Sequence, residues 1–254
     1  MKKLKDKFLS GEKVYGTQIM MCDTAIGDIF SSVGYDFLWL DTEHSCIDYK
    51  QLLGYIGLCE AKGVSTIIRL HIDDYNHTKR VLEMGPSGVI FPMINTREQA
   101  EKAIRSTYYP LKGTRGIGAQ RYGRYGIDSL ETLITKQEDM IRCIQLETKE
   151  AISNLEEIVK VEGIDCFVFG LWDLSFDIGK PGDVLCEEES ELVKRAIEIL
   201  RKNNKAIGMA TSNTDLTFLQ KWADMGISFI AAGSDFDFLR IGAENTLKSL
   251  KEIV

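Results

Sequence analysis

Short apolar segments recur along the chain, and a longer segment with many polar positions separates each one from the next. The short segments are rich in Val, Ile, Leu and Phe and are apolar on both faces, which is typical of strands in a covered parallel sheet. We therefore predict strands at residues 14–20, 37–41, 65–70, 88–93, 142–147, 166–170, 206–210 and 228–233.

The longer segments place their apolar residues three and four positions apart, which predicts amphipathic helices. Several of them end in glycine, as helices commonly do. They cover residues 48–63, 74–85, 96–109, 148–163, 189–205 and 214–226. Buried strands that alternate with helices predict a parallel sheet whose faces are covered by those helices.

This alternation in a chain of 254 residues favours a single (β/α)8 TIM barrel over residues 1–254. The alternative is an open doubly wound sheet, but Gly16-Thr17-Gln18 does not supply the glycine-rich phosphate loop that usually follows the first strand of that fold. The chain has only four prolines and no low-complexity linker, which argues for one domain. The irregular stretch at 110–128 is long for a compact domain, and such loops are commonly functional.

Composition excludes several classes of partner. A formal net charge of −7 argues against the basic surface that nucleic-acid binding requires. No segment reaches the roughly 18 apolar residues of a membrane span, and no apolar stretch follows the charged first residues, so we expect a cytoplasmic protein without a secretory signal. The cysteines lack the paired spacing of zinc or redox sites, which predicts reduced thiols at Cys22, Cys46, Cys59, Cys143, Cys166 and Cys186.

Polar and titratable residues follow several of the predicted strands. In a parallel barrel the active site lies at the carboxyl ends of the strands, so these residues would face one mouth. A single polar residue at a strand end is as well explained by the start of a loop, but the set as a whole favours function. The residues are Asp41, Glu43 and His44 after the second strand, Arg69 in the third, Gln145 and Glu147 in the fifth, and Asp173 after the sixth.

Glu147 and Asp173 lie one strand-helix-strand repeat apart, which places their carboxylates on adjacent strand ends. Carboxylates with open coordination positions suit the hard ions Mg²⁺ and Mn²⁺. The alternatives are a helix N-cap for Asp173 and an ion pair with Lys149 for Glu147.

Arg69 ends a buried strand, so its guanidinium would face the mouth, where its fixed fork suits a carboxylate or an enolate. An ion pair with Asp41 or Glu43 is the alternative, and it does not exclude the first role. No lysine lies within a predicted strand or at its carboxyl end, which disfavours Schiff-base chemistry.

His44 is the best candidate for a general base, because a neighbouring carboxylate can orient its imidazole and raise its basicity. His71 and His77 lie in or beside the segment after the third strand, and we expect them on the surface.

These residues resemble the HpcH/HpaI family of class II, metal-dependent pyruvate aldolases, in the barrel superfamily that handles pyruvate and phosphoenolpyruvate. The resemblance spans nearly the whole chain and combines Asp-x-Glu-His, Pro-Met after the fourth strand, Gln-x-Glu-Thr and Asp-Leu-Ser. The stretches that carry it lie at 34–48, around Arg69, and at 79–104, 108–118, 124–126, 145–158 and 161–175.

The resemblance implies a proton-transferring base at His44 and an enolate-stabilising cation at Arg69. It implies that Glu147 and Asp173 hold a divalent ion, Mg²⁺ or Mn²⁺ with Co²⁺ as a further candidate. Gln145 and the backbone at Trp172 would contact the pyruvate moiety, and Asp173 also borders this substrate site. These assignments follow from matching positions in the family motifs.

Further positions concern the base and the pocket. Glu83 matches the family position whose carboxylate raises the basicity of the histidine, where Asp is usual, and Asp41 is the alternative support for His44. The family typically has Gly-Pro and a small residue before Asp-Leu, and here Leu171 and Trp172 replace the proline and the small residue. Ala119 stands where a small polar residue is common. An indole here either narrows the pocket and alters aldehyde specificity or turns outward into an interface.

The expected reaction is reversible aldol cleavage of a 2-keto-4-hydroxy acid to pyruvate and an aldehyde through a pyruvate enolate. Two alternatives stay open: a citrate-lyase-like coenzyme A thioester lyase, and a non-catalytic keto-acid-binding protein. We expect the loop at 114–126 to cover the site and to hold a distal carboxylate through Arg115, Arg121 and Arg124, unless these arginines serve subunit contacts. The resemblance also implies a homo-oligomer, a trimer or hexamer, whose C-terminal helix at 245–254 packs on a neighbour.

Overall fold

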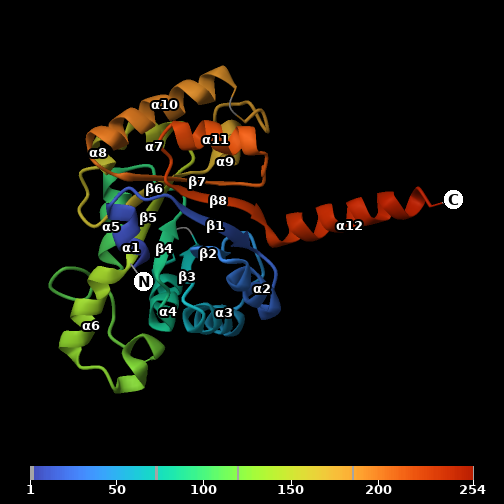
Figure 1. Ribbon diagram of the computed structural model, residues 1–254. Helices are drawn as coiled ribbons and strands as arrows, with labels where there is room; N and C mark the ends of the chain where they lie inside the picture. The colour runs from blue at the N-terminus through green and yellow to red at the C-terminus, as the bar shows by residue number, and fades with distance from the viewer. Residues whose placement is uncertain (1–2, 72–73, 119, 185, 254) are drawn as a thin grey trace.

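The eight predicted strands form a closed parallel barrel in the order β1-β2-β3-β4-β5-β6-β7-β8, which confirms the (β/α)8 fold (Figure 1). The protein is represented by a computed structural model that describes residues 3–71, 74–118, 120–184 and 186–253. The strands are β1 (Val14–Ile19), β2 (Phe37–Asp41), β3 (Ser65–Arg69), β4 (Gly88–Phe91), β5 (Ile141–Leu146), β6 (Cys166–Phe169), β7 (Ala206–Thr211) and β8 (Phe229–Ser234).

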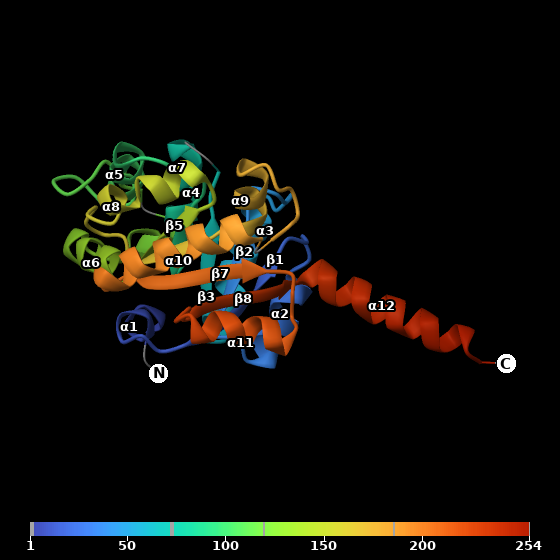
Figure 2. The ribbon, with the colours of Figure 1, turned by 90° about the horizontal axis from the view of Figure 1, so that it is seen from above.

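The helices cover the outside of the barrel, apart from one that closes its amino end and one that projects from it (Figures 1 and 2). They are α1 (Leu4–Leu9), α2 (Thr24–Val33), α3 (Tyr49–Ala61), α4 (Tyr75–Met84), α5 (Arg97–Arg105), α6 (Leu130–Lys136), α7 (Lys149–Ser153), α8 (Leu155–Ile158), α9 (Leu171–Asp177), α10 (Glu187–Lys202), α11 (Leu216–Asp224) and α12 (Asp235–Lys251), with 3₁₀ turns at Arg121–Gly126 and Gln137–Asp139.

Helix starts follow local capping chemistry. Asp48 and Thr96 each form a capping box, in which the cap side chain accepts the amide of the third helical residue and the Gln side chain there accepts the amide of the cap. These caps fix where α3 and α5 begin after β2 and β4. The helix predicted at 148–163 is instead divided at Asn154 into α7 and α8.

The alternating faces of β2 show how the barrel separates two cores. Leu38 and Leu40 are buried against the surrounding helices, whereas Phe37 and Trp39 belong to the core inside the barrel. The Phe37 ring stacks on Phe229 of β8 with centroids 4.2 Å apart. Because successive strand residues point to opposite faces, the next inward position on β2 is Asp41 at the mouth.

Helix α12 leaves the barrel after β8 and extends away from the other elements (Figures 1 and 2). The observed helix, Asp235–Lys251, begins ten residues before the predicted C-terminal helix at 245–254. Among the described residues, no helix is long and apolar enough to cross a membrane. The apolar side chains that α12 exposes include Leu239, Leu247 and Leu250.

Candidate active site

A buried ion pair joins the carboxyl ends of β2 and β3. The Asp41 side chain is fully buried, and the Arg69 side chain is only 9% exposed. Arg69 Nε donates to Asp41 Oδ1 at 3.1 Å, and Arg69 Nη2 donates to Asp41 Oδ2, so the contact is bidentate. The pairing of Asp41 with Arg69 across the strands sets these side chains opposite each other. The ion pair anticipated for Arg69 is therefore present.

Asp41 also holds the loop that carries the histidine. Its Oδ1 accepts the backbone amides of Glu43 at 2.9 Å and His44 at 3.2 Å, and the Ser45 hydroxyl donates to its carbonyl. Asp41 therefore supports the backbone of His44, and the imidazole has a different acidic neighbour. That neighbour is Glu43, whose Oε2 lies 3.8 Å from His44 Nε2. The His44 side chain is 59% exposed.

Glu147 lies just after β5 and is almost completely buried. Its Oε1 accepts the Met93 amide at 2.5 Å, and its Oε2 accepts from the Gln145 side chain. Gln145 Oε1 is buried without a partner among the described residues. A Cβ on Gly170 would lie 2.7 Å from both Gln145 Nε2 and Glu147 Oε2, so glycine is needed for this close approach.

The charges around Glu147 are mainly negative. Burial, together with the charges of Asp173 and Glu43, raises the pKa of Glu147 to about 7, although the Met93 amide and the Arg69 charge act in the opposite direction. Burial also raises the pKa of Glu43 above its ordinary value. Asp173, in the first turn of α9, is exposed. Glu43, Glu147 and Asp173 thus form one acidic cluster next to a guanidinium that Asp41 already binds.

This cluster fits a divalent cation. Two carboxylates from adjacent strands, a buried amide oxygen without a partner and excess negative charge are the environment that a hard cation stabilises. Within the described ranges, no group of three or more His, Cys, Asp and Glu side chains is placed as a complete metal cage. Glu147 and Asp173 are the two carboxylates of this cluster that could hold an ion, with its remaining positions open to substrate and water.

The comparisons with known proteins agree with this geometry. Residues 20–240 match the HpcH/HpaI aldolase/citrate lyase family. The chain belongs to this family. A hydroxypyruvate/pyruvate aldolase of Pseudomonas aeruginosa is 30% identical over 99% of this chain and 91% of its own length. A 4-hydroxy-2-oxo-heptane-1,7-dioate aldolase of Klebsiella pneumoniae is 29% identical over 94% of this chain and 90% of its own length.

A solved HpcH/HpaI aldolase structure from Desulfitobacterium hafniense superposes with a TM-score of 0.93. It covers 100% of this chain and 98% of the other chain at 23% sequence identity. At that identity the likeness shows the shared barrel fold, which the closed order of the strands shows independently.

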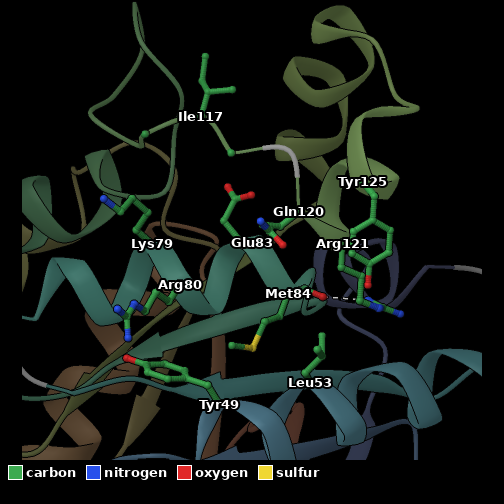
Figure 3. A pocket seen from close by; sticks show the side chains of 12 residues that line it. Tyr49, Leu53, Lys79, Arg80, Glu83, Met84, Ile117, Gln120, Arg121 and Tyr125 are labelled. Carbon is green, nitrogen blue, oxygen red and sulfur yellow. Dashed lines mark hydrogen bonds between the residues drawn. The ribbon is translucent and has the colours of Figure 1, made fainter.

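Glu83, which the family resemblance implies as a support for the histidine, lies on α4 and contacts other residues. It points from α4 towards the segment that carries Ile117, in a pocket of about 540 Å³ between α3, α4 and residues 116–125 (Figure 3). Its Oε1 accepts from Arg115 Nη2 at 3.4 Å, and its Oε2 is buried without a partner among the described residues. Within one chain, Glu83 therefore pairs with Arg115 and makes no described contact with His44.

The three arginines of the loop at 114–126 are each engaged away from the barrel mouth. The Arg115 side chain is fully buried, with its guanidinium over the rings of Tyr109 and Tyr122. Arg121 donates to the Met84 carbonyl at 2.8 Å and to Glu60, and Arg124 pairs with Asp128. The prediction that these arginines hold a distal carboxylate is thus wrong for Arg115, and neither of the others faces the site in the described chain. Ala119 lies outside the described residues.

Of the two orientations considered for the Trp172 indole, into the pocket or outward, its environment favours the outward one. Its side chain is 59% exposed, and its ring lies beside Gly182. Its backbone amide is in the first turn of α9, where helix amides lack intrahelical acceptors. The amide can therefore face a ligand although the indole turns away from it.

His77 is buried, which contradicts the expectation of a surface position. The Thr42 hydroxyl donates to the Arg69 carbonyl, so His77 Nε2 must donate to Thr42 Oγ1 at 2.9 Å. The Tyr49 hydroxyl then donates to His77 Nδ1 at 3.0 Å. The His71 ring stacks on that of His77 with centroids 3.9 Å apart. A neutral imidazole thus links the His44 loop to α3 and α4, a contact for which the sequence pattern gave no signal.

We expect His77 to make the protein less stable in acid. Burial, with a smaller contribution from the charge of the neighbouring His71, lowers the pKa of His77 from an ordinary value near 6.5 to about 4. Between these values the unfolded chain binds a proton that the folded chain does not, so stability is complete above about pH 6.5 and falls as the pH decreases towards 4.

The measurement is urea unfolding at pH 7 and pH 5 for the wild type and His77→Gln. The wild type should lose more unfolding free energy between the two pH values than the variant, by about 1 kcal/mol after allowance for solvent screening. Equal losses would show that the acid sensitivity arises from other groups. Exposed Lys50→Gln, near the start of α3, serves as the control and should match the wild type.

Proposed function

We propose that the protein is a metal-dependent aldolase that reversibly cleaves a 2-keto-4-hydroxy acid to pyruvate and an aldehyde. The observation that carries this proposal is the gathering of Arg69, Glu147, Asp173 and the His44 loop at one end of a barrel that belongs to an aldolase family. The named aldolase relatives support it, because they cover nearly the whole chain.

Arg69 supplies fixed positive charge for the developing enolate. Burial works against its charged form, but the hydrogen bond and charge of Asp41, together with Glu43, outweigh this and raise its pKa. The guanidinium therefore stays protonated, and its bond to Asp41 holds it in one orientation. A preorganised cation of this kind stabilises charge that develops during reaction without reorganising.

His44 moves the proton. Its imidazole is exposed to the mouth and lies 3.8 Å from Glu43, a carboxylate that can orient it and stabilise its protonated form. In cleavage it takes the proton of the C4 hydroxyl, and in the reverse direction it returns that proton to the new alkoxide. We therefore propose that Glu43 supports the His44 imidazole, because Glu83 pairs with Arg115 instead.

Glu147 and Asp173 hold the divalent ion, for which we propose Mg²⁺ or Mn²⁺, with Co²⁺ also acceptable to oxygen ligands. When bound, the ion supplies Lewis-acid stabilisation of the keto oxygen. The Gln145 side-chain amide donates to Glu147, and its carbonyl oxygen is buried without a partner among the described residues, so it is available to a ligand at this site. The backbone amide of Trp172 binds the substrate carboxylate.

The first test is exchange of the methyl protons of pyruvate in heavy water, followed by NMR with Mg²⁺ or Mn²⁺ present. Exchange should occur, should stop on addition of a chelator, and should fall about 10²- to 10⁴-fold in His44→Ala, since that variant removes the proton-transferring group. Arg69→Lys keeps the positive charge, so the buried Asp41 carboxylate still has a cationic partner. The variant loses the bidentate geometry of the guanidinium, and it should therefore exchange pyruvate more slowly than the wild type.

Exposed Lys50→Ala, close to His44 in sequence, is the control and should exchange like the wild type. Pyruvate binding without exchange would overturn the aldolase proposal in favour of a keto-acid-binding protein. Cleavage of a coenzyme A thioester without exchange of pyruvate would favour a citrate-lyase-like activity, which also occurs in this family of aldolases and citrate lyases.

The second test measures Mn²⁺ affinity by calorimetry. Glu147→Gln and Asp173→Asn should each weaken binding at least about tenfold, because each removes a charged oxygen ligand. Glu150→Gln changes an exposed carboxylate of α7 and should leave the affinity unaltered. Unchanged affinity in both site variants would place the metal elsewhere.

We also propose a cytoplasmic homo-oligomer, a trimer or hexamer, in which α12 packs on a neighbouring subunit. Six free cysteines suit a reducing compartment. Phe236, Leu239, Leu247 and Leu250 are exposed and lie three, eight and three residues apart, which places them on one side of α12. They form an apolar stripe on a helix that projects from its own barrel.

Analytical ultracentrifugation tests this assembly. The double change Leu239→Glu and Leu247→Glu should shift the protein to smaller species, because it places charge on the apolar stripe. Lys248→Glu alters charge on the same helix outside the stripe and should keep the wild-type mass. A monomeric wild type, or an assembly unaffected by the double change, would contradict the role of α12.

A further inference from the structure

Two thiols lie in contact on the loops that follow β1 and β2. Cys22 Sγ lies 3.9 Å from Cys46 Sγ, and both cysteines are free. Cys46 is exposed and Cys22 is half-buried. Cys46 lies two positions after His44 on the same loop. The sequence separates the two cysteines too widely for any short redox motif, and only the closed barrel brings their loops together.

The loop that carries Cys22 is fixed from two sides. The buried Asp235 carboxylate accepts the amides of Met20 at 3.0 Å and Met21 at 2.8 Å. The Tyr55 hydroxyl lies within hydrogen-bond distance of the carbonyls of Met21 and Asp23, at 2.9 and 2.7 Å. These contacts bracket Cys22 and hold its thiol next to the neighbouring loop.

The loop that carries Cys46 is fixed by its own backbone contacts. Ser45 donates to the Asp41 carbonyl, and its Oγ accepts the Ile47 amide at 3.2 Å. Asp48 then caps α3. The two thiols therefore face each other because both backbones are anchored, which lowers the entropic cost of joining them.

We propose that Cys22 and Cys46 are a site of reversible disulfide formation, oxidised by a peroxide, that links the His44 loop to the loop after β1. The Cys46 thiolate attacks the peroxide, an S–O bond forms, the O–O bond breaks and water leaves. The Cys22 thiolate then attacks the Cys46 sulfenic sulfur, an S–S bond forms, and the sulfenic oxygen leaves as a second water. Two thiols lose two electrons, and the peroxide is reduced to two waters.

Accessibility sets the order of attack. Cys46 is exposed to the oxidant, whereas partial burial raises the pKa of the Cys22 thiol above its ordinary value and the adjacent Cys46 thiol adds to this shift. Cys46 is thus the attacking thiol and Cys22 the resolving one. Closing the contact from 3.9 Å to a bond of about 2.05 Å requires only a small displacement of the side chains and loops.

The other cysteines provide an internal contrast. Cys143 and Cys166 are also neighbours, paired in register on β5 and β6, but both are fully buried inside the barrel, where an oxidant has no access. Cys59 is a fully buried residue of α3, and the partly exposed Cys186 is a single free thiol. Proximity and access coincide only at Cys22 and Cys46 among the described residues.

The effect on catalysis rests on the proposed function. The disulfide pulls on the short segment between His44 and Cys46, so it displaces the imidazole from the position that Asp41 and Glu43 define. Pyruvate exchange should therefore fall in proportion to the fraction of linked protein and return when dithiothreitol reduces the bond.

The experiment treats the full chain with hydrogen peroxide and follows intact mass, peptide mapping without reductant, and pyruvate exchange. We expect loss of two hydrogens, one linked peptide pair containing Cys22 and Cys46, and a matching loss of exchange. Cys22→Ser and Cys46→Ser should not form the link. Cys22→Ser should accumulate a Cys46 sulfenic acid that dimedone traps, whereas Cys186→Ser should behave as the wild type.

Absence of the Cys22–Cys46 peptide, or a link that forms equally in a single-serine variant, would overturn the assignment of the pair. A complete link with unchanged exchange would overturn its effect on His44. If the reduced wild type exchanges no pyruvate at all, the proposed function fails, while the mass and peptide measurements still decide whether the disulfide forms.

Discussion

The bidentate bond between Asp41 and Arg69 is the contact on which the mouth of the barrel depends. Asp41 is a fully buried carboxylate, and it avoids the cost of burial by accepting two guanidinium bonds and two backbone amides. The same side chain therefore sets the direction of Arg69 and the path of the loop that carries His44. Loss of Arg69 would leave the buried Asp41 charge without its cation, at a cost of about 3–5 kcal/mol.

This pairing also explains the charge of the rest of the site. Arg69 pairs with both Asp41 and the partly buried Glu43, so a single cation faces several carboxylates and the buried Glu147 lies in a surplus of negative charge that Asp173 increases. With its pKa raised to about 7, Glu147 would bind a proton near neutral pH unless a cation compensated its charge. This surplus of negative charge is the reason why the proposed function includes a divalent ion.

The sequence predicts most of this arrangement because strand order in a barrel is simple. Apolar runs locate all eight strands, and the polar residue that ends each run must face the mouth, which is why Asp41, Arg69 and Glu147 are found together as expected. Contacts between loops are different, because their partners come from distant helices. The burial of His77 depends on Thr42 and Tyr49, and no periodic pattern encodes that contact.

Glu83 and Arg115 show that a match to a family motif also leaves contacts with loops undetermined. A motif match fixes the position of Glu83 on α4, but the direction of its side chain depends on where the irregular segment at 116–125 folds, and that segment has no repeating pattern to read. The pairing of Cys22 with Cys46 is likewise a product of loop anchoring by Asp235 and Asp41. Residues in loops therefore needed the structure, whereas residues at strand ends did not.

The inner layers of the barrel connect its packing to its chemistry. Phe229 stacks on Phe37 at 4.2 Å and lies 6.4 Å from the Trp39 ring, and the Arg69 guanidinium lies 5.7 Å above Trp39. The guanidinium is thus supported from below by an aromatic column and from the side by Asp41. A change in the lower layer must reach the site through Trp39, because its ring is the surface on which Arg69 rests. The aromatic core is for this reason part of what holds the Arg69 guanidinium in place.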